Sequence, residues 1–169
     1  AAGGRQLRRH ADAGPDLGQL TRRGPMQPAH LASVRVDAPA GFAFAHLSDG
    51  RRLGRWALGS MDLTPGDEAG VWHGISLFDG SPAEVEIRPH AGLGLIDFHL
   101  GPAGARVPRV SIRVTPGPDW GLPEDCCLVA MTTWRAGWMD EERWNRTRRT
   151  HELEVLLFKA QIETDWSRR

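Results

Sequence analysis

The sequence contains no tyrosine and only one lysine, Lys159, among its 21 basic residues. These basic residues are matched by 21 acidic ones, so the formal net charge is zero. A protein that holds nucleic acid through a general basic surface needs an excess of positive charge, and we therefore expect no nucleic-acid partner. The sequence also lacks a run of about 18 uncharged apolar residues, so we expect no stable insertion into a membrane.

Cysteine is scarce as well, and the two cysteines, Cys126 and Cys127, are adjacent. Neighbouring side chains on a strand point to opposite faces, which disfavours a disulfide between them. Two cysteines without a disulfide framework are typical of a reducing compartment, so we expect a cytoplasmic protein. The sequence has no Cys-x-x-Cys pair, phosphate-binding loop or dinucleotide fingerprint, and we expect no metal and no cofactor.

The distribution of apolar residues predicts one folded domain behind an N-terminal extension. At about 100–200 residues per domain, a chain of 169 residues fits a single domain. Residues 1–29 carry five arginines and no apolar periodicity, a composition typical of disorder. We expect a disordered extension over 1–29 and the folded domain over 30–169.

Short patterned segments make up the folded domain, separated by Pro, Gly and Asp. Alternation predicts a strand over 31–37, and Asp37 followed by Pro39 predicts the start of a helix. A second short helix is expected over 51–56. Regularly spaced strands then follow, which predicts an antiparallel meander with one apolar face. These strands are expected at 61–64, 71–78, 84–88, 93–100, 106–115 and 126–135.

A long helix is predicted over about 140–166, where the chain has an acidic first turn. At about 100° per residue, its apolar side chains form two stripes. One stripe can cover the sheet, whereas the other needs a neighbour: part of the same domain, a second subunit or a ligand. The first stripe consists of Trp144, His151, Val155, Phe158 and Ile162, and the second of Leu153, Leu156, Leu157 and Ala160.

Two stretches carry a resemblance to a known superfamily. Residues 34–56 contain an acidic-x-Pro turn, an aromatic helix, Leu-Ser-Asp and Trp56, and residues 142–163 form the closing helix. This arrangement resembles the START-like (SRPBCC, polyketide cyclase-like) superfamily. The resemblance implies an α+β helix-grip fold: a curved antiparallel sheet wrapped around a long C-terminal helix, with two short helices after the first strand, enclosing a cavity. The superfamily includes lipid carriers, hormone receptors, cyclases and chaperone activators, so no shared catalytic set carries over.

The predicted cavity supplies the candidate site residues. Two histidines are expected as acid–base catalysts or as hydrogen-bond anchors for a ligand, because an imidazole titrates near neutral pH. The alternative for each is an ordinary packed histidine. The two histidines are His151 and His73, and the expected apolar walls are Ile75, Phe98, Ile112, Trp134, Trp144, Val155 and Phe158.

Other polar residues are expected at the surface. Asp97 and His99 share one strand face, which is predicted to point to solvent and not to bind metal. Four arginines begin the long helix and could receive an acidic ligand or partner, but pairing with nearby glutamates at i,i+4 is the simpler interpretation. These arginines are Arg143, Arg146, Arg148 and Arg149, and the glutamates include Glu154.

Three functions are compatible with this reading. The first is binding of a hydrophobic small molecule between the sheet and the long helix. The second is a cyclase- or dehydratase-like enzyme on the same fold, using His151 with His73 as the acid–base pair. The third is an interaction module or homodimer formed through the stripe that contains Leu153 and Leu156.

Overall fold

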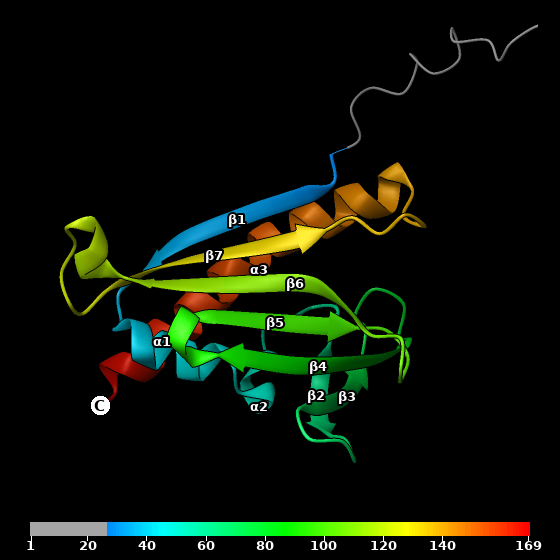
Figure 1. Cartoon of the computed structure of the whole chain (residues 1–169), viewed down its shortest axis with the longest axis horizontal. Coiled ribbons are helices and arrows are strands. Elements are labelled where there is room, and N and C mark those ends of the chain that lie inside the picture. The colour runs from blue at the N-terminus through cyan, green and yellow to red at the C-terminus, as the bar shows by residue number, and fades with distance from the viewer. Residues whose placement is uncertain (1–26) are drawn as a thin grey trace, which may run out of the picture.

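The computed structural model describes residues 27–169. The disordered extension expected over 1–29 lies outside the described residues except for its last three positions, and Ala29 is the first residue of a strand. Within the described chain, seven strands, three α-helices and two short 3-10 helices follow one another (Figure 1). In chain order they are β1 (Ala29–Val36), α1 (Ala40–Leu47), α2 (Gly50–Leu53), β2 (Met61–Pro65), β3 (Val71–Ile75), β4 (Pro82–His90), η2 (Ala91–Leu93), β5 (Leu95–Leu100), β6 (Val107–Pro116), η3 (Gly117–Trp120), β7 (Cys127–Trp134) and α3 (Glu141–Ser167).

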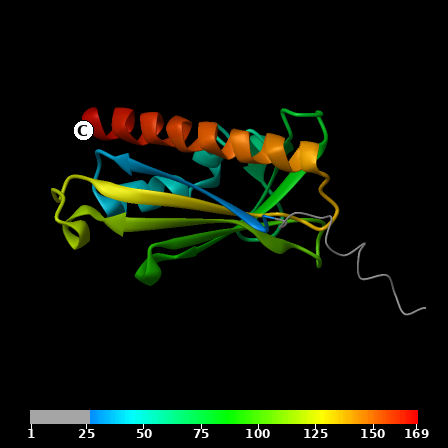
Figure 2. The same cartoon turned by 90° about the horizontal axis from the view of Figure 1, so that it is seen from above.

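All seven strands form one antiparallel sheet in the order β1-β7-β6-β5-β4-β3-β2. The strands from β2 to β7 form the predicted meander, and β1 then pairs with β7. The sheet curves, so that β2 and β3 run across the direction of β1, β7 and β6 (Figure 1). Helix α3 lies along one face of the sheet (Figure 2). The predicted helix-grip fold is therefore confirmed.

The helix ends show where local sequence signals operate. Asp140 caps α3 by accepting a hydrogen bond from the backbone N–H of Arg143 at 2.8 Å, and Asp49 caps α2 in the same way. The helix predicted to start after Asp37 and Pro39 is present, but Asp37 does not cap it. Helix α1 begins after Pro39 without a side-chain cap, and the carboxylate of Asp37 instead accepts from Arg35 at 3.0 Å.

The two apolar stripes of α3 have different environments. The first stripe is buried against the sheet and the short helices, as predicted. The second stripe faces outward at Leu153, which is 48% exposed, and at Leu156, which is 56% exposed, whereas its Leu157 is half-buried against the core. None of the helices in residues 27–169 combines the length and apolarity needed to cross a membrane.

Candidate functional site

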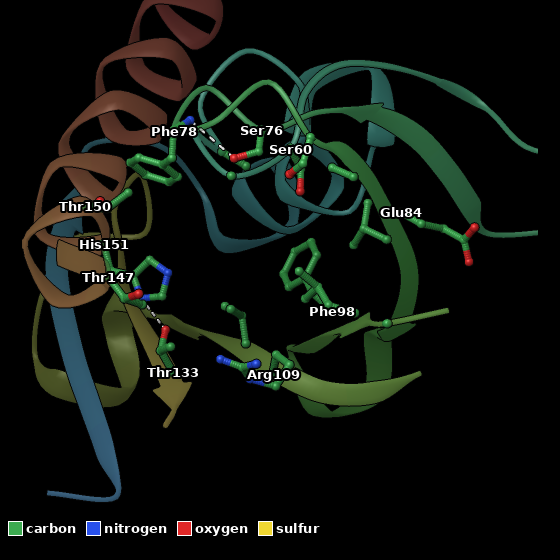
Figure 3. A pocket seen from close by; sticks show the side chains of 18 of the residues that line it. Ser60, Ser76, Phe78, Glu84, Phe98, Arg109, Thr133, Thr147, Thr150 and His151 are labelled. Carbon is green, nitrogen blue, oxygen red and sulfur yellow. Dashed lines mark hydrogen bonds between the residues drawn. The ribbon is translucent and has the colours of Figure 1, made fainter. Parts of the chain in front are cut away.

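A cavity of about 740 Å³ lies between the sheet and the N-terminal half of α3 (Figure 3). Most of its wall comes from apolar side chains on strands β4 to β7 and on the segment after α2. The main apolar lining residues are Leu53, Trp56, Val85, Phe98, Leu100, Val110, Met131 and Met139. The exposed lining residues Phe78, Val107, Trp138, Arg143 and Arg146 define what we call the cavity mouth.

Trp56 separates the cavity from the solid core. Its ring makes edge-on contacts with Phe98, at 6.3 Å between centroids, and with Phe158, at 5.3 Å. Phe98 lines the cavity, whereas Phe158 is fully buried and does not. The residues of α3 that line the cavity all lie within residues 143–154, in the N-terminal half of the helix, whereas Phe158 and Ile162 are fully buried outside the lining.

Polar side chains gather on the α3 side of the cavity. The Nδ1 atom of His151 hydrogen-bonds the hydroxyl of Thr133 on β7. The Nε2 atom of His151 lies 3.6 Å from Oε2 of Glu154, one turn further along α3. The other carboxyl oxygen of Glu154 accepts a hydrogen bond from the backbone N–H of Leu58 at 2.7 Å. Figure 3 shows the imidazole of His151 across the cavity from the ring of Phe98.

Burial shifts the two titratable groups in opposite directions. It lowers the pKa of His151 to about 4, with a further contribution from the nearby His30 and Arg109. It raises the pKa of Glu154 to about 8, although the backbone N–H groups of Leu58 and Gly59 favour the charged form. Near neutral pH the imidazole is therefore neutral and the carboxyl is protonated. The two are not an ion pair, and 3.6 Å is too long for a direct hydrogen bond.

This arrangement juxtaposes a proton acceptor and a proton donor in an apolar cavity. Neutral His151 can accept a proton, and protonated Glu154 can donate one. Pairs of groups whose pKa values are pushed apart by their surroundings are a frequent basis for acid–base catalysis.

Of the nine residues predicted for the site, two line the cavity. Phe98 contributes to its wall and His151 to its polar side. The buried side chains Ile112, Trp144, Val155 and Phe158 belong to the packed interior and lie outside the lining.

The remaining three predicted residues, His73, Ile75 and Trp134, are exposed and also lie outside the lining. The residue before His73 on β3, Trp72, packs over α2. A Cβ at position 50 would lie 2.1 Å from the indole of Trp72, so a glycine is required at that position. His73 consequently faces the other way, with Nδ1 3.5 Å from Glu84.

Glu154 is the site residue that sequence reasoning missed. It was expected on a solvated charged face, but its side chain is buried and lines the cavity. Its position gives the reason, because residue 154 lies three after His151 and four before Phe158 on the buried face of α3. That spacing was a readable signal.

The expectation for His99 needs a correction as well. His99 is only 9% exposed and is therefore not open to solvent, at the sheet position where it pairs with Glu86 of β4. Asp97 accepts a hydrogen bond from the hydroxyl of Ser111 at 2.5 Å. Within residues 27–169, no three His, Cys, Asp or Glu side chains gather closely enough to hold a metal ion.

Comparisons with known proteins find the fold and no family. No protein-family model matches the sequence. No curated protein matches it. Solved structures do match, among them the Aha1 dimer from Colwellia psychrerythraea, which is 11% identical with a TM-score of 0.57 over 80% of this chain and 96% of that one.

Two further structures come from biosynthetic loci. DynU16, a protein of the dynemicin biosynthetic locus, is 15% identical with a TM-score of 0.58 over 84% of this chain and 49% of its own. StfQ, a di-domain ARO/CYC from the steffimycin biosynthetic pathway, is 16% identical with a TM-score of 0.56 over 82% and 46%. At such identities the likeness shows the fold alone. The chain is thus a helix-grip protein with a lined cavity, and it corresponds to about half of each of these two proteins.

Proposed function

We propose that this protein binds a hydrophobic small molecule, such as a lipid or a polyketide, in the cavity between the sheet and α3. The observation that carries the proposal is the cavity itself. Its volume of about 740 Å³ lies in the range of small-molecule sites, and its wall is mainly apolar with a few polar groups on one side. The fold shared with StfQ and DynU16 supports the same class of ligand.

Blocking the cavity should abolish binding. Thr147 lines the cavity from α3, and Thr147→Trp would place an indole in the space that a ligand needs. We expect wild-type protein to bind N-phenyl-1-naphthylamine, a neutral apolar dye, and Thr147→Trp to bind it at least about tenfold more weakly. The measurement is a fluorescence titration of the dye.

The matched control is Ala160→Trp, which adds the same indole to the exposed face of the same helix. This variant should keep wild-type affinity. Wild-type protein that binds no dye, and that releases no small molecule on organic extraction, would contradict the proposal. Equal affinity in both variants would show that the dye sits elsewhere.

A second candidate function is acid–base catalysis on the bound molecule, in the manner of a cyclase or dehydratase. The observation that favours it is the pair formed by His151 and Glu154, a neutral base beside a protonated acid. His73 has no part in this pair, because its side chain is exposed and its nearest carboxylate is Glu84.

Exchange of carbon-bound hydrogen would reveal such chemistry. If the pair is catalytic, the compound that co-purifies with the protein should exchange its acidic C–H positions for deuterium in D₂O. We expect His151→Gln to slow this exchange about 100-fold or more while the dye affinity stays within about twofold of wild type. Mass spectrometry of the extracted compound measures the exchange. If the C–H positions of the compound exchange equally fast in the absence of the protein, the catalytic hypothesis is contradicted and binding remains the proposed function.

A homodimer through α3 is compatible with either function. The outward stripe exposes Leu153 and Leu156, and a second copy of the chain would cover both side chains. The matching Aha1 structure is a dimer, which supports dimerisation but does not say through which face.

A further inference from the structure

We propose that the cavity mouth anchors an anionic head group, so that the ligand is an amphiphile with an apolar body and a carboxylate, sulfonate or phosphate at one end. This inference rests on the proposed function and deepens it. Three arginines carry it: Arg109 from β6 and Arg143 and Arg146 from α3, all of which line the cavity.

A bulge brings Arg109 to this position. On β5 and β6, Phe98 pairs with Val110, but the next residue, His99, pairs with Pro108. Arg109 is therefore the extra residue of β6, and its side chain lines the cavity. Figure 3 shows Arg109 at the edge of the cavity beside Thr133.

Aromatic side chains hold the arginines in a cluster. The guanidinium carbon of Arg109 lies 5.6 Å from the ring centre of Trp138, and that of Arg143 lies 4.7 Å from the same ring. Arg146 lies 5.6 Å from the ring of Phe78. Trp138 is 63% exposed and Phe78 is 44% exposed, so the rings that these arginines contact present an exposed surface at the mouth. Such a surface suits the junction between the apolar body and the charged head of an amphiphile.

These three arginines also lack acidic partners. Within the part of the chain that the structure describes, no carboxylate lies within 4.0 Å of Arg109, Arg143 or Arg146, whereas Arg106 and Arg135 each contact at least one. The sequence reading, which expected the arginines of α3 to pair with glutamates, was wrong for Arg143 and Arg146.

The acidic residues nearest the cavity are already engaged. Glu84 is held by Arg106 at 2.5 Å. Asp79 accepts hydrogen bonds from Ser81 at 2.6 and 3.1 Å, and its charge acts on Arg143 only from beyond ion-pair distance. Glu154 is buried and its pKa is raised to about 8, so it supplies no counter-charge near neutral pH. Burial and the charge of Arg143 lower the pKa of Arg109.

The charge is local. The whole chain has a formal net charge of zero, so a positive cluster at the mouth does not reflect a generally basic surface. Guanidinium groups bind carboxylate, sulfonate and phosphate oxygens through paired, charge-assisted hydrogen bonds. An anionic head group would form such hydrogen bonds with these arginines while the apolar body of the ligand fills the cavity below them.

Two dyes with the same aromatic body test this inference. N-phenyl-1-naphthylamine is neutral, and 8-anilino-1-naphthalenesulfonate adds one sulfonate to the same ring system. We expect the double variant Arg143→Gln/Arg146→Gln to bind the sulfonate dye about tenfold or more weakly than wild type, and to bind the neutral dye within about twofold. Added salt at about 0.5 M should weaken the sulfonate dye more in wild type than in the double variant.

Arg149→Gln is the control, because Arg149 is exposed on the same helix but does not line the cavity. It should leave both affinities unchanged. If the neutral dye binds but the sulfonate dye is insensitive to the double variant, or equally sensitive to Arg149→Gln, the anionic anchor is overturned and the proposed function stands. If neither dye binds, the proposed function fails and this inference fails with it.

Discussion

Replacing Glu154 by Gln should raise the free energy of unfolding by about 3–5 kcal/mol at pH 9 and change it little at pH 5. Burial raises the pKa of this carboxyl from 4.5 to about 8 in the folded protein. Between those two values the folded protein holds a proton that the unfolded chain has released. Stability contributed by this group therefore falls as the pH rises from about 4.5 to 8. A glutamine stays neutral at every pH and removes that loss.

Urea unfolding at pH 5, 7 and 9 measures the effect. Glu142→Gln is the matched control, because Glu142 is exposed near the start of the same helix. Glu142→Gln should change the free energy of unfolding by less than about 0.5 kcal/mol at each pH. An equal effect of Glu154→Gln at pH 5 and pH 9 would mean that the carboxyl is already ionised in the folded protein at low pH.

The same variant separates the two candidate functions. A protein that only binds its ligand gains stability from Glu154→Gln without losing affinity for N-phenyl-1-naphthylamine. A protein that uses Glu154 as a proton donor gains the same stability but loses turnover. Catalytic groups are often held in surroundings that disfavour their charged form, and the protein loses stability as a result.

The second large effect is expected at Trp56, where Trp56→Ala should lower the free energy of unfolding by about 3–5 kcal/mol. The indole is 2% exposed and touches both Phe98 on the cavity side and Phe158 on the core side. Its removal joins the cavity to the space left in the core. The variant should therefore keep its affinity for the neutral dye if it remains folded, because the cavity is enlarged and not closed.

Urea unfolding followed by circular dichroism measures this loss without depending on tryptophan fluorescence. Trp120→Ala is the control, since Trp120 is 65% exposed on η3 and should cost less than about 0.5 kcal/mol. Trp56→Phe keeps part of the aromatic wall, so its loss of unfolding free energy should lie between those of Trp56→Ala and Trp120→Ala. A loss below about 1 kcal/mol for Trp56→Ala would contradict the role of Trp56 as the partition.

Much of the fold could be predicted because its signals are local. The Pro and Gly turns cut the chain into strands close to those observed, and the acidic first turn located the start of α3 within about one residue. The stripe that contains Trp144, His151 and Phe158 is buried as its spacing indicates. In each case a few neighbouring residues carry the information.

The candidate site was harder to predict, since it depends on which face of each strand points inward. On β3, the contact of Trp72 with Gly50 turns His73 outward, and the two residues are 22 positions apart in the sequence. On β6, a single bulge brings Arg109 into the cavity. A shift of one residue in strand register reverses every face, and sequence periodicity alone does not specify it.

The sequence by itself determined the order of elements, the buried stripe of α3 and the presence of His151 on the inner face of that helix, because these follow from side-chain periodicity along one segment. Only the tertiary structure decided that Glu154 lines an apolar cavity where it holds its proton, that Trp56 divides cavity from core and that three arginines line the cavity near its mouth. Those features arise where segments distant in the chain come together, and the burial and charge that each side chain experiences are properties of that assembly.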